Sequence, residues 1–169
     1  MILLTTNPAK YGPFVAELKT LGIVLSPPDQ PLVEFQENDV ETCARMKALW
    51  AARREGHAVL VDDVGLSLKA HPGFPGPMTG YALRTISVEG WTALTASDSG
   101  AEMICVLAWS DGERIESWVG RASGYLEPNK PVDPAGPGPL ASWFQCAEGP
   151  LTHRRRALAA MKHSKGGKI

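Results

Sequence analysis

The chain has 169 residues, which suits one domain and is enough to bury about two-thirds of its unfolded surface. It contains 17 Lys and Arg residues and 18 Asp and Glu residues, so the formal net charge is −1. This balance argues against the broad positive field that holds nucleic acid through its phosphates, and we expect no nucleic-acid partner.

The remaining composition points to an ordinary cytoplasmic protein. The apolar start, Met1 to Thr6, is too short for a signal peptide or a membrane span, so we expect no membrane association. The three cysteines are odd in number, far apart and without a C-x-x-C pair, which favours reduced structural thiols: Cys43, Cys105 and Cys146.

The N-terminal third is expected to hold a strand followed by two helices. Residues 2–4 form a continuous apolar run, typical of a strand buried on both faces. Asn7-Pro8 then supplies an N-cap and a first-turn proline for a helix that ends at Gly22. A second helix is expected from Asp39 to Gly56, with an apolar stripe that only Lys47 interrupts.

The middle of the chain predicts a strand, a pair of helices and a hairpin. Residues 58–61 indicate a buried strand that delivers Asp62 and Asp63 at its carboxyl end, before a proline-rich loop. Residues 79–96 look helical with a break near 87–90. Strands at 102–110 and 113–120 are joined by Asp111-Gly112, a dipeptide suited to a two-residue type I′ turn.

The C-terminal part is expected to be irregular and then helical. Residues 127–139 contain five prolines and two glycines, which predicts a surface loop. Thr152 is expected to cap a last helix that runs to about residue 162. We expect one domain over residues 1–163, and residues 164–169 as a flexible tail.

Two segments and one lysine could bind phosphate or metal, and each also has an ordinary structural interpretation. The turn from Thr5 to Lys10 offers free N–H groups and a lysine to phosphate, or is a plain helix cap. Asp62 and Asp63 could hold Mg²⁺, together with one of the acids Glu34, Glu37 and Glu41, or could simply cap a loop. Lys47 must reach solvent or meet an anion.

The last helix opens with cations, which is unfavourable for its macrodipole by about 0.3–1 kcal/mol. An anion bound at His153 and Arg154 would explain this order. Arg155 and Arg156 are better interpreted as a solvated basic face.

In order and spacing, these segments resemble the inosine/xanthosine triphosphate pyrophosphatase family across most of the chain. The most specific piece is the strand followed by Asp-Asp-x-Gly-Leu and a later Pro-Gly-Pro, and the second is Thr-His-Arg on the last helix. The matching segments are Thr5 to Lys10, Glu41 to Ala48, Val59 to Leu66, Phe74 to Pro77, Gly120 to Gly124 and Thr152 to Arg154.

The resemblance implies a mixed α/β fold with a strongly curved central sheet and flanking helices forming two lobes around a nucleotide cleft. It implies a homodimer, Mg²⁺ as cofactor, and a nucleoside triphosphate as substrate, first of all a deaminated purine such as ITP, dITP or XTP. The products would be the monophosphate and pyrophosphate, formed when activated water attacks the α-phosphorus.

The resemblance also implies roles for individual residues. Catalysis would rest on Asp62, Asp63 and Lys47, and the metal on Glu34, Asp62 and Asp63. Glu41 is the alternative to Glu34, because the helix-opening acid of many bacterial members falls nearer to it. Substrate contacts would come from Thr6, Asn7, Lys10, Trp143, Phe144, His153 and Arg154. Asp62 and Asp63 are expected in a solvated metal site, so that replacing either abolishes turnover and leaves folding near normal.

The chain departs from the family pattern in three places. Gly136 to Phe144 replaces the family's base-stacking segment, with Trp143 or Phe144 left to stack. The stretch before His153 is short and lacks a lysine-containing loop, and Thr79 to Tyr81 stand where relatives carry a lysine. These differences leave two alternatives open: a pyrophosphatase retuned to another (d)NTP, and a catalytically weakened nucleotide-binding protein.

Overall fold

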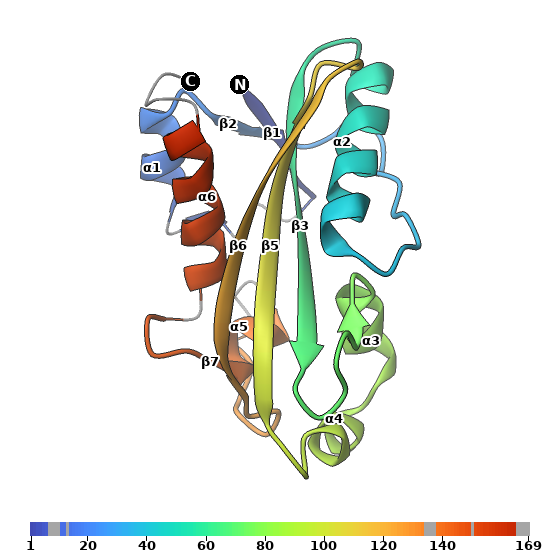
Figure 1. The fold of residues 1–169 in the computed structure, drawn as a ribbon, viewed down its shortest axis with the longest axis vertical. Coiled ribbons are helices and arrows are strands. Elements are labelled where there is room, and N and C mark those ends of the chain that lie inside the picture. Colours follow the sequence, from blue (N-terminus) through green and yellow to red (C-terminus); the bar gives the residue numbers. More distant parts are fainter. Residues whose placement is uncertain (7–10, 13, 134–137, 150, 165–169) are drawn as a thin grey trace.

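The computed structural model describes residues 1–6, 11–12, 14–133, 138–149 and 151–164. Its centre is a curled, mixed sheet of seven strands in the order β2-β1-β3-β5-β6-β7, with β4 paired to β3 (Figure 1). β1 is parallel to both β2 and β3, and the other pairs are antiparallel. The strands are β1 (Ile2–Leu4), β2 (Val24–Ser26), β3 (Val59–Leu68), β4 (Pro75–Gly76), β5 (Gly100–Ser110), β6 (Ile115–Leu126) and β7 (Phe144–Gln145).

Six helices in the described residues flank this sheet. Near one end, α1 and α6 cover one face and α2 covers the other, while α3, α4 and α5 lie toward the opposite end (Figure 1). No helix among the described residues is long and apolar enough to cross a membrane. The helices are α1 (Val15–Thr20), α2 (Val40–Glu55), α3 (Thr79–Thr85), α4 (Val88–Leu94), α5 (Pro139–Trp143) and α6 (Thr152–Ser164).

The apolar core consists of three clusters of buried side chains. One lies between the sheet and the helices α1 and α6, and includes Phe14, Leu60 and Met161. The second lies under α2, where small side chains such as Ala48 let the helix approach the strands closely. The third fills the far end around Trp91. The long strands β3 and β5 contribute to all three clusters, so they connect the two ends of the molecule.

Glycines permit two close contacts that position functional segments. A Cβ on Gly120 of β6 would lie 2.0 Å from the carbonyl oxygen of His153, so α6 sits directly on the sheet. A Cβ on Gly65 of β3 would lie 2.4 Å from a methyl of Val40, so the start of α2 packs against β3. A side chain at either glycine would push the helix away from the strand.

Several expected elements are confirmed. β1 and α2 have the expected positions, with Asp39 as N-cap, accepting from the Thr42 N–H at 2.7 Å, and with Gly56 as C-cap in the left-handed region. The helical region 79–96 breaks at Ser87, which caps α4. Residues 127–133 and the described residue 138 lie outside helices and strands, and the expected tail at 165–169 lies outside the described residues.

Three local expectations were wrong. β3 does not end at residue 61 but continues to Leu68, because β5 pairs with it along its whole length. The hairpin loop has four residues, 111–114, since Ser110 pairs with Ile115 and the Asp111 carboxylate accepts from the N–H groups of Glu113 and Arg114. Thr152 is the first residue of α6, and its hydroxyl donates to the Gly149 carbonyl oxygen.

Candidate active site

Asp62 and Asp63 lie in the middle of β3, beside a gap in the sheet. β1 pairs with β3 only as far as Leu60, and β4 pairs from Leu66 onward. Between these points, the described residues place no strand on that side of β3, whereas β5 continues along the other side. The two acids therefore lie beside an open stretch of the β3 edge, and not at a strand end as the sequence predicted.

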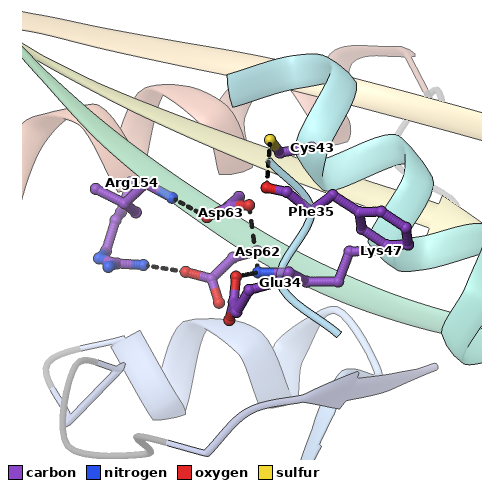
Figure 2. A network of polar contacts seen from close by, with 8 residues as sticks. Glu34, Phe35, Cys43, Lys47, Asp62, Asp63 and Arg154 are labelled. Atoms are coloured by element: carbon purple, nitrogen blue, oxygen red, sulfur yellow. Dashed lines mark hydrogen bonds and ion pairs between the residues drawn. The ribbon is translucent and has the colours of Figure 1, made fainter. Parts of the chain in front are cut away.

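Because side chains alternate along a strand, the two neighbouring acids turn to opposite faces of the sheet. Asp62 meets Arg154 of α6, and Asp63 meets Lys47 of α2 (Figure 2). α6 and α2 cover opposite faces (Figure 1). The adjacent acids thus have separate cationic partners.

Lys47 joins two acids on the α2 side. Its ammonium lies 2.8 Å from a Glu34 oxygen and 3.2 Å from an Asp63 oxygen (Figure 2). The Lys47 side chain is buried and contacts anions, so it does not reach solvent, which was the other alternative. Burial alone would lower the pKa of Lys47, but Asp63 and Glu34 reverse this and raise it above its ordinary value. Lys47 is therefore a fixed cation beside the open edge.

The negative charge of Asp63 is balanced less completely than the positive charge of Lys47. Burial raises the pKa of Asp63, Lys47 lowers it, and the nearby carboxylates of Glu34 and Asp62 raise it again, so that the pKa stays above its ordinary value. One ammonium serves two carboxylates here, which leaves excess negative charge for a further cation. This is the kind of shifted carboxylate that functional sites often contain.

Asp62 forms a buried ion pair on the other face. Its Oδ2 accepts from Nη1 of Arg154 at 2.6 Å, and the two side chains are only 2% and 11% exposed. The Arg154 guanidinium also lies over the ring of Tyr11, 5.3 Å from its centroid. The expectation that Asp62 lies in a solvated site was therefore wrong, because α1 and α6 close over it.

Tyr11 is the residue of this cluster that sequence reasoning missed. Burial raises the pKa of Tyr11, and the Asp62 carboxylate raises it further. No spacing in the sequence relates Tyr11 to Asp62 or Arg154, so the only available signal was an aromatic residue next to the expected phosphate turn.

His153 is buried at the start of α6, and burial lowers the pKa of His153 to about 3. Its ring is therefore neutral at physiological pH. Its Nδ1 has no hydrogen-bond partner within the part of the chain that the structure describes. Arg155 and Arg156 are exposed, as expected, and Arg156 pairs with Glu148.

The upstream acid that joins Lys47 is Glu34. Glu41, the alternative, accepts a hydrogen bond from the Ser117 hydroxyl at 2.7 Å on β6, so its carboxylate is directed elsewhere. Glu37 is exposed. The sequence pattern around Glu41 therefore marks the correct helix, while the acid next to Lys47 comes from the segment before it.

The expected phosphate turn is described only in part. Thr6 is exposed and, with Thr5, borders a hollow of about 520 Å³ whose other wall includes Ser26 and the prolines that follow it. Asn7 and Lys10 lie outside the described residues. The hollow opens next to the segment that carries Glu34, which is continuous with its wall at Pro31.

Trp143 and Phe144, expected as base-stacking residues, lie in the apolar cluster at the far end. The Trp143 ring makes an edge contact with Trp91 at 6.3 Å between centroids, and its Nε1 donates to the Lys130 carbonyl oxygen. Phe144 is fully buried above Gly124. In this structure both rings pack in the core instead of presenting a free face to a ligand.

The acids suit a metal ion that keeps water or substrate oxygens as ligands, and do not form a site in which the protein supplies every ligand. The described residues contain no cluster of three or more acidic, histidine or cysteine side chains that could hold a metal ion. Mg²⁺ usually takes one or two carboxylates and completes its octahedron with water and substrate phosphates. Glu34 and Asp63 can supply those oxygens, whereas the Asp62 side chain is only 2% exposed and is paired with Arg154.

The fold and these side chains together indicate a site for a polyphosphate, with a fixed cation and paired acids at an open strand edge. Comparison with known proteins agrees with this class. Residues 1–164 match the model of the Ham1 family, and the chain belongs to that family.

Named relatives cover most of the chain. A dITP/XTP pyrophosphatase of Pyrobaculum aerophilum is 38% identical over 126 residues, which span 73% of this chain and 67% of that protein. An inosine triphosphate pyrophosphatase of Tuber melanosporum is 28% identical over 96% of this chain and 94% of its own length. The second match extends through the C-terminal region that departs from the expected family pattern.

Solved structures share the fold. A HAM1 protein from Coxiella burnetii superposes with a TM-score of 0.75 and 20% identity, covering 98% of both chains. The Staphylococcus aureus Ham1 protein gives a TM-score of 0.71 with the same coverage and 21% identity. The curved mixed sheet with flanking helices, expected from the sequence, is therefore confirmed.

Proposed function

We propose that this protein hydrolyses a nucleoside triphosphate to the monophosphate and pyrophosphate, with deaminated purine triphosphates (ITP, dITP and XTP) as its first substrates. The observation that carries this proposal is the buried Lys47 between Glu34 and Asp63 at the open edge of β3. Membership of the Ham1 family and the names of its dITP/XTP and inosine triphosphate pyrophosphatase relatives support it.

The residues divide the work by position. Lys47 neutralises phosphate oxygens, and a lysine about 4 Å from such an oxygen contributes on the order of 4 kcal/mol at an effective dielectric near 20, before desolvation. Asp63, with a pKa above its ordinary value, accepts a proton from the attacking water. Glu34 and Asp63 would hold Mg²⁺, which polarises the phosphate oxygens when it is bound.

Arg154 and His153 hold the substrate from the α6 side, and Thr6, Asn7 and Lys10 hold its outer phosphates. The Arg154 guanidinium donates to Asp62 from Nη1, and a guanidinium has further N–H donors that a ligand can use. The Thr5–Thr6 turn borders the hollow near Glu34, which supports a phosphate position there. We also propose that the protein works as a homodimer in the cytoplasm and acts on free nucleotides and not on nucleic acid.

The products of ITP hydrolysis test the proposal directly. Purified protein incubated with ITP and Mg²⁺ should yield IMP and pyrophosphate on ion-exchange chromatography. An Asp63→Asn variant, prepared in parallel, should yield neither product and controls for contaminating hydrolases. IDP and orthophosphate would contradict the proposed position of cleavage, and no product from any triphosphate would favour the weakened nucleotide-binding protein.

One observation favours a second candidate, a pyrophosphatase retuned to another (d)NTP. Trp143 and Phe144 are both buried in the far core, so the segment that replaces the family's base-stacking element has no free ring there. A panel of standard and deaminated (d)NTPs separates the two candidates. A kcat/KM for a standard nucleotide at or above that for ITP, dITP and XTP would select the retuned enzyme.

A further inference from the structure

Glu34 belongs to a segment whose own structure does not fix its position. Residues 27–35, here called the Glu34 segment, join β2 to the approach of α2 and contain no helix or strand. The Glu34 side chain is 77% exposed, so burial does not hold it next to Lys47. A free segment of this kind would lose conformational entropy each time Glu34 took its place, unless other contacts held it.

Helix α2 supplies those contacts on both sides of Glu34. Before Glu34, Arg54 donates from Nη2 to the Gln30 carbonyl oxygen and from Nη1 to the Pro31 carbonyl oxygen, both at 3.1 Å. After Glu34, the Cys43 thiol donates to the Phe35 carbonyl oxygen at 3.4 Å (Figure 2). Lys47 lies on the same helix, so α2 sets both partners of the Lys47–Glu34 ion pair.

The Arg54 guanidinium is itself fixed in place. It donates to Glu55 Oε1 from Nη2 at 2.6 Å and from Nε at 3.2 Å, and it lies 4.3 Å from the centroid of the Trp50 ring. The Glu55 side chain is only 7% exposed, which keeps its carboxylate in place. A planar guanidinium can make all these contacts at once, whereas a lysine ammonium cannot.

The two carbonyl groups that Arg54 holds also belong to the wall of the hollow beside Thr5 and Thr6. Gln30 and Pro31 line this hollow of about 520 Å³ together with the two threonines. Arg54 contacts the segment through its backbone and takes no part in the ion pairs of Lys47. Its contacts therefore act on the site only through the position of the segment.

We propose that Arg54 is a positioning residue: it holds the Glu34 segment against α2, so that Glu34 stays at Lys47 and the hollow beside Thr5–Thr6 keeps its wall. The kinetic part of this inference rests on the function proposed above. The structural part, the immobilisation of residues 30–35 by Arg54, does not.

The test compares Arg54→Ala and Arg54→Lys with Arg53→Ala. Arg53 is a matched control, because it is the neighbouring arginine of α2 and donates from Nε to a loop carbonyl oxygen, that of Gly112, at 2.9 Å. The Gly112 loop carries no residue of the candidate site. Cleavage after Glu34 by a glutamate-specific protease, quantified by mass spectrometry, reports the mobility of the segment, and the urea midpoint reports the stability of the whole fold.

In Arg54→Ala, the rate of cleavage after Glu34 should rise on the order of tenfold, because two hydrogen bonds from a charged donor to the segment are lost. The KM for ITP and the Mg²⁺ concentration for half-maximal rate should rise by a similar factor. Arg54→Lys should recover the urea midpoint but only part of the resistance to cleavage. Arg53→Ala should match the wild type in the rate of cleavage and in KM.

A double variant shows whether Arg54 acts through Glu34. In a Glu34→Gln background, Arg54→Ala should change the Mg²⁺ requirement by less than twofold, because the carboxylate that it positions is already gone. An equal change in both backgrounds would overturn the link to Glu34. An unchanged rate of cleavage after Glu34 in Arg54→Ala would overturn the positioning role itself, even if the wild type released no pyrophosphate and the proposed function failed.

Discussion

Replacing Asp62 by Asn is expected to destabilise the fold by about 3 kcal/mol, because it removes the charge that balances a buried arginine. The Asp62 and Arg154 side chains are 2% and 11% exposed and meet at 2.6 Å. At an effective dielectric near 20, a pair at this separation attracts by about 6 kcal/mol. The Asn oxygen still accepts a hydrogen bond from Arg154, so the loss is expected to be about half of this attraction and near the low end of measured values for broken buried pairs.

Urea unfolding followed by circular dichroism measures this loss as a lower midpoint at an unchanged m-value. In thermal unfolding, about 3 kcal/mol in a domain of this size lowers Tm by roughly 6–12 °C. Both measurements need no substrate and no metal, so they test the ion pair independently of the proposed function.

Asp63→Asn is the matched comparison, because it changes the same side chain one position further along the strand. Lys47 keeps Glu34 at 2.8 Å in this variant. Burial and neighbouring acids raise the pKa of Asp63, so the fold disfavours its ionised form and the neutral Asn relieves that cost. Asp63→Asn should therefore cost less stability at pH 7 than Asp62→Asn does. Equal wild-type stability in both variants would refute the buried pair and restore the solvated site expected from sequence.

Two further predictions concern pH and charge. Burial lowers the pKa of His153 to about 3, below its unfolded value of 6.5, so this contribution to stability is complete above pH 6.5. It is lost as the pH falls from 6.5 toward 3, by at most about 1.4 kcal/mol per pH unit. The urea midpoint should depend less on pH between 7.5 and 5 in His153→Asn than in the wild type. Equal pH dependence in the two proteins would contradict the buried neutral ring. Lys47→Ala should lower kcat/KM for ITP at least a hundredfold, as expected for a cation on a phosphate. Normal kinetics in this variant would remove Lys47 from the site.

Helix α2 was predictable because the signals at its two ends are local, whereas α1 begins only at Val15 and α5 was not expected. Asp39 and Gly56 mark the two ends of α2 in the sequence, and the structure shows the side-chain cap at the first and the left-handed conformation at the second. The lysine in the apolar stripe of this helix also predicted that Lys47 needs either solvent or an anion. The sequence could not choose between these, because both acids that meet Lys47 come from other segments.

The length of β3 was not predictable from its own residues. The apolar run ends at Val61, where two acids follow, and this looks like the end of a strand. The strand continues because residues of β5 pair with it as far as Leu68, which pairs with Ala101. Tertiary pairing of this kind overrides local preference, and no nearby residue announces it.

The partner of Arg154 was likewise not predictable from the sequence. Asp62 and Arg154 are 92 positions apart in the chain, and their contact depends on how α6 is placed on the sheet. The absence of a side chain at Gly120 permits that placement. The sequence motif identified both residues as functional candidates, but it gave no reason to join them to each other.

The alternation of side chains along β3 gives the two adjacent acids different tasks. Asp62 is directed to α6, where it balances the charge of Arg154 inside the core. Asp63 is directed to α2, where it shares Lys47 with Glu34. A shift of the β3 register by one residue would exchange these faces and leave Arg154 without its acid. The pairing of β3 with β5 therefore determines which acid pairs with α6 and which pairs with α2, although the two are neighbours in the chain.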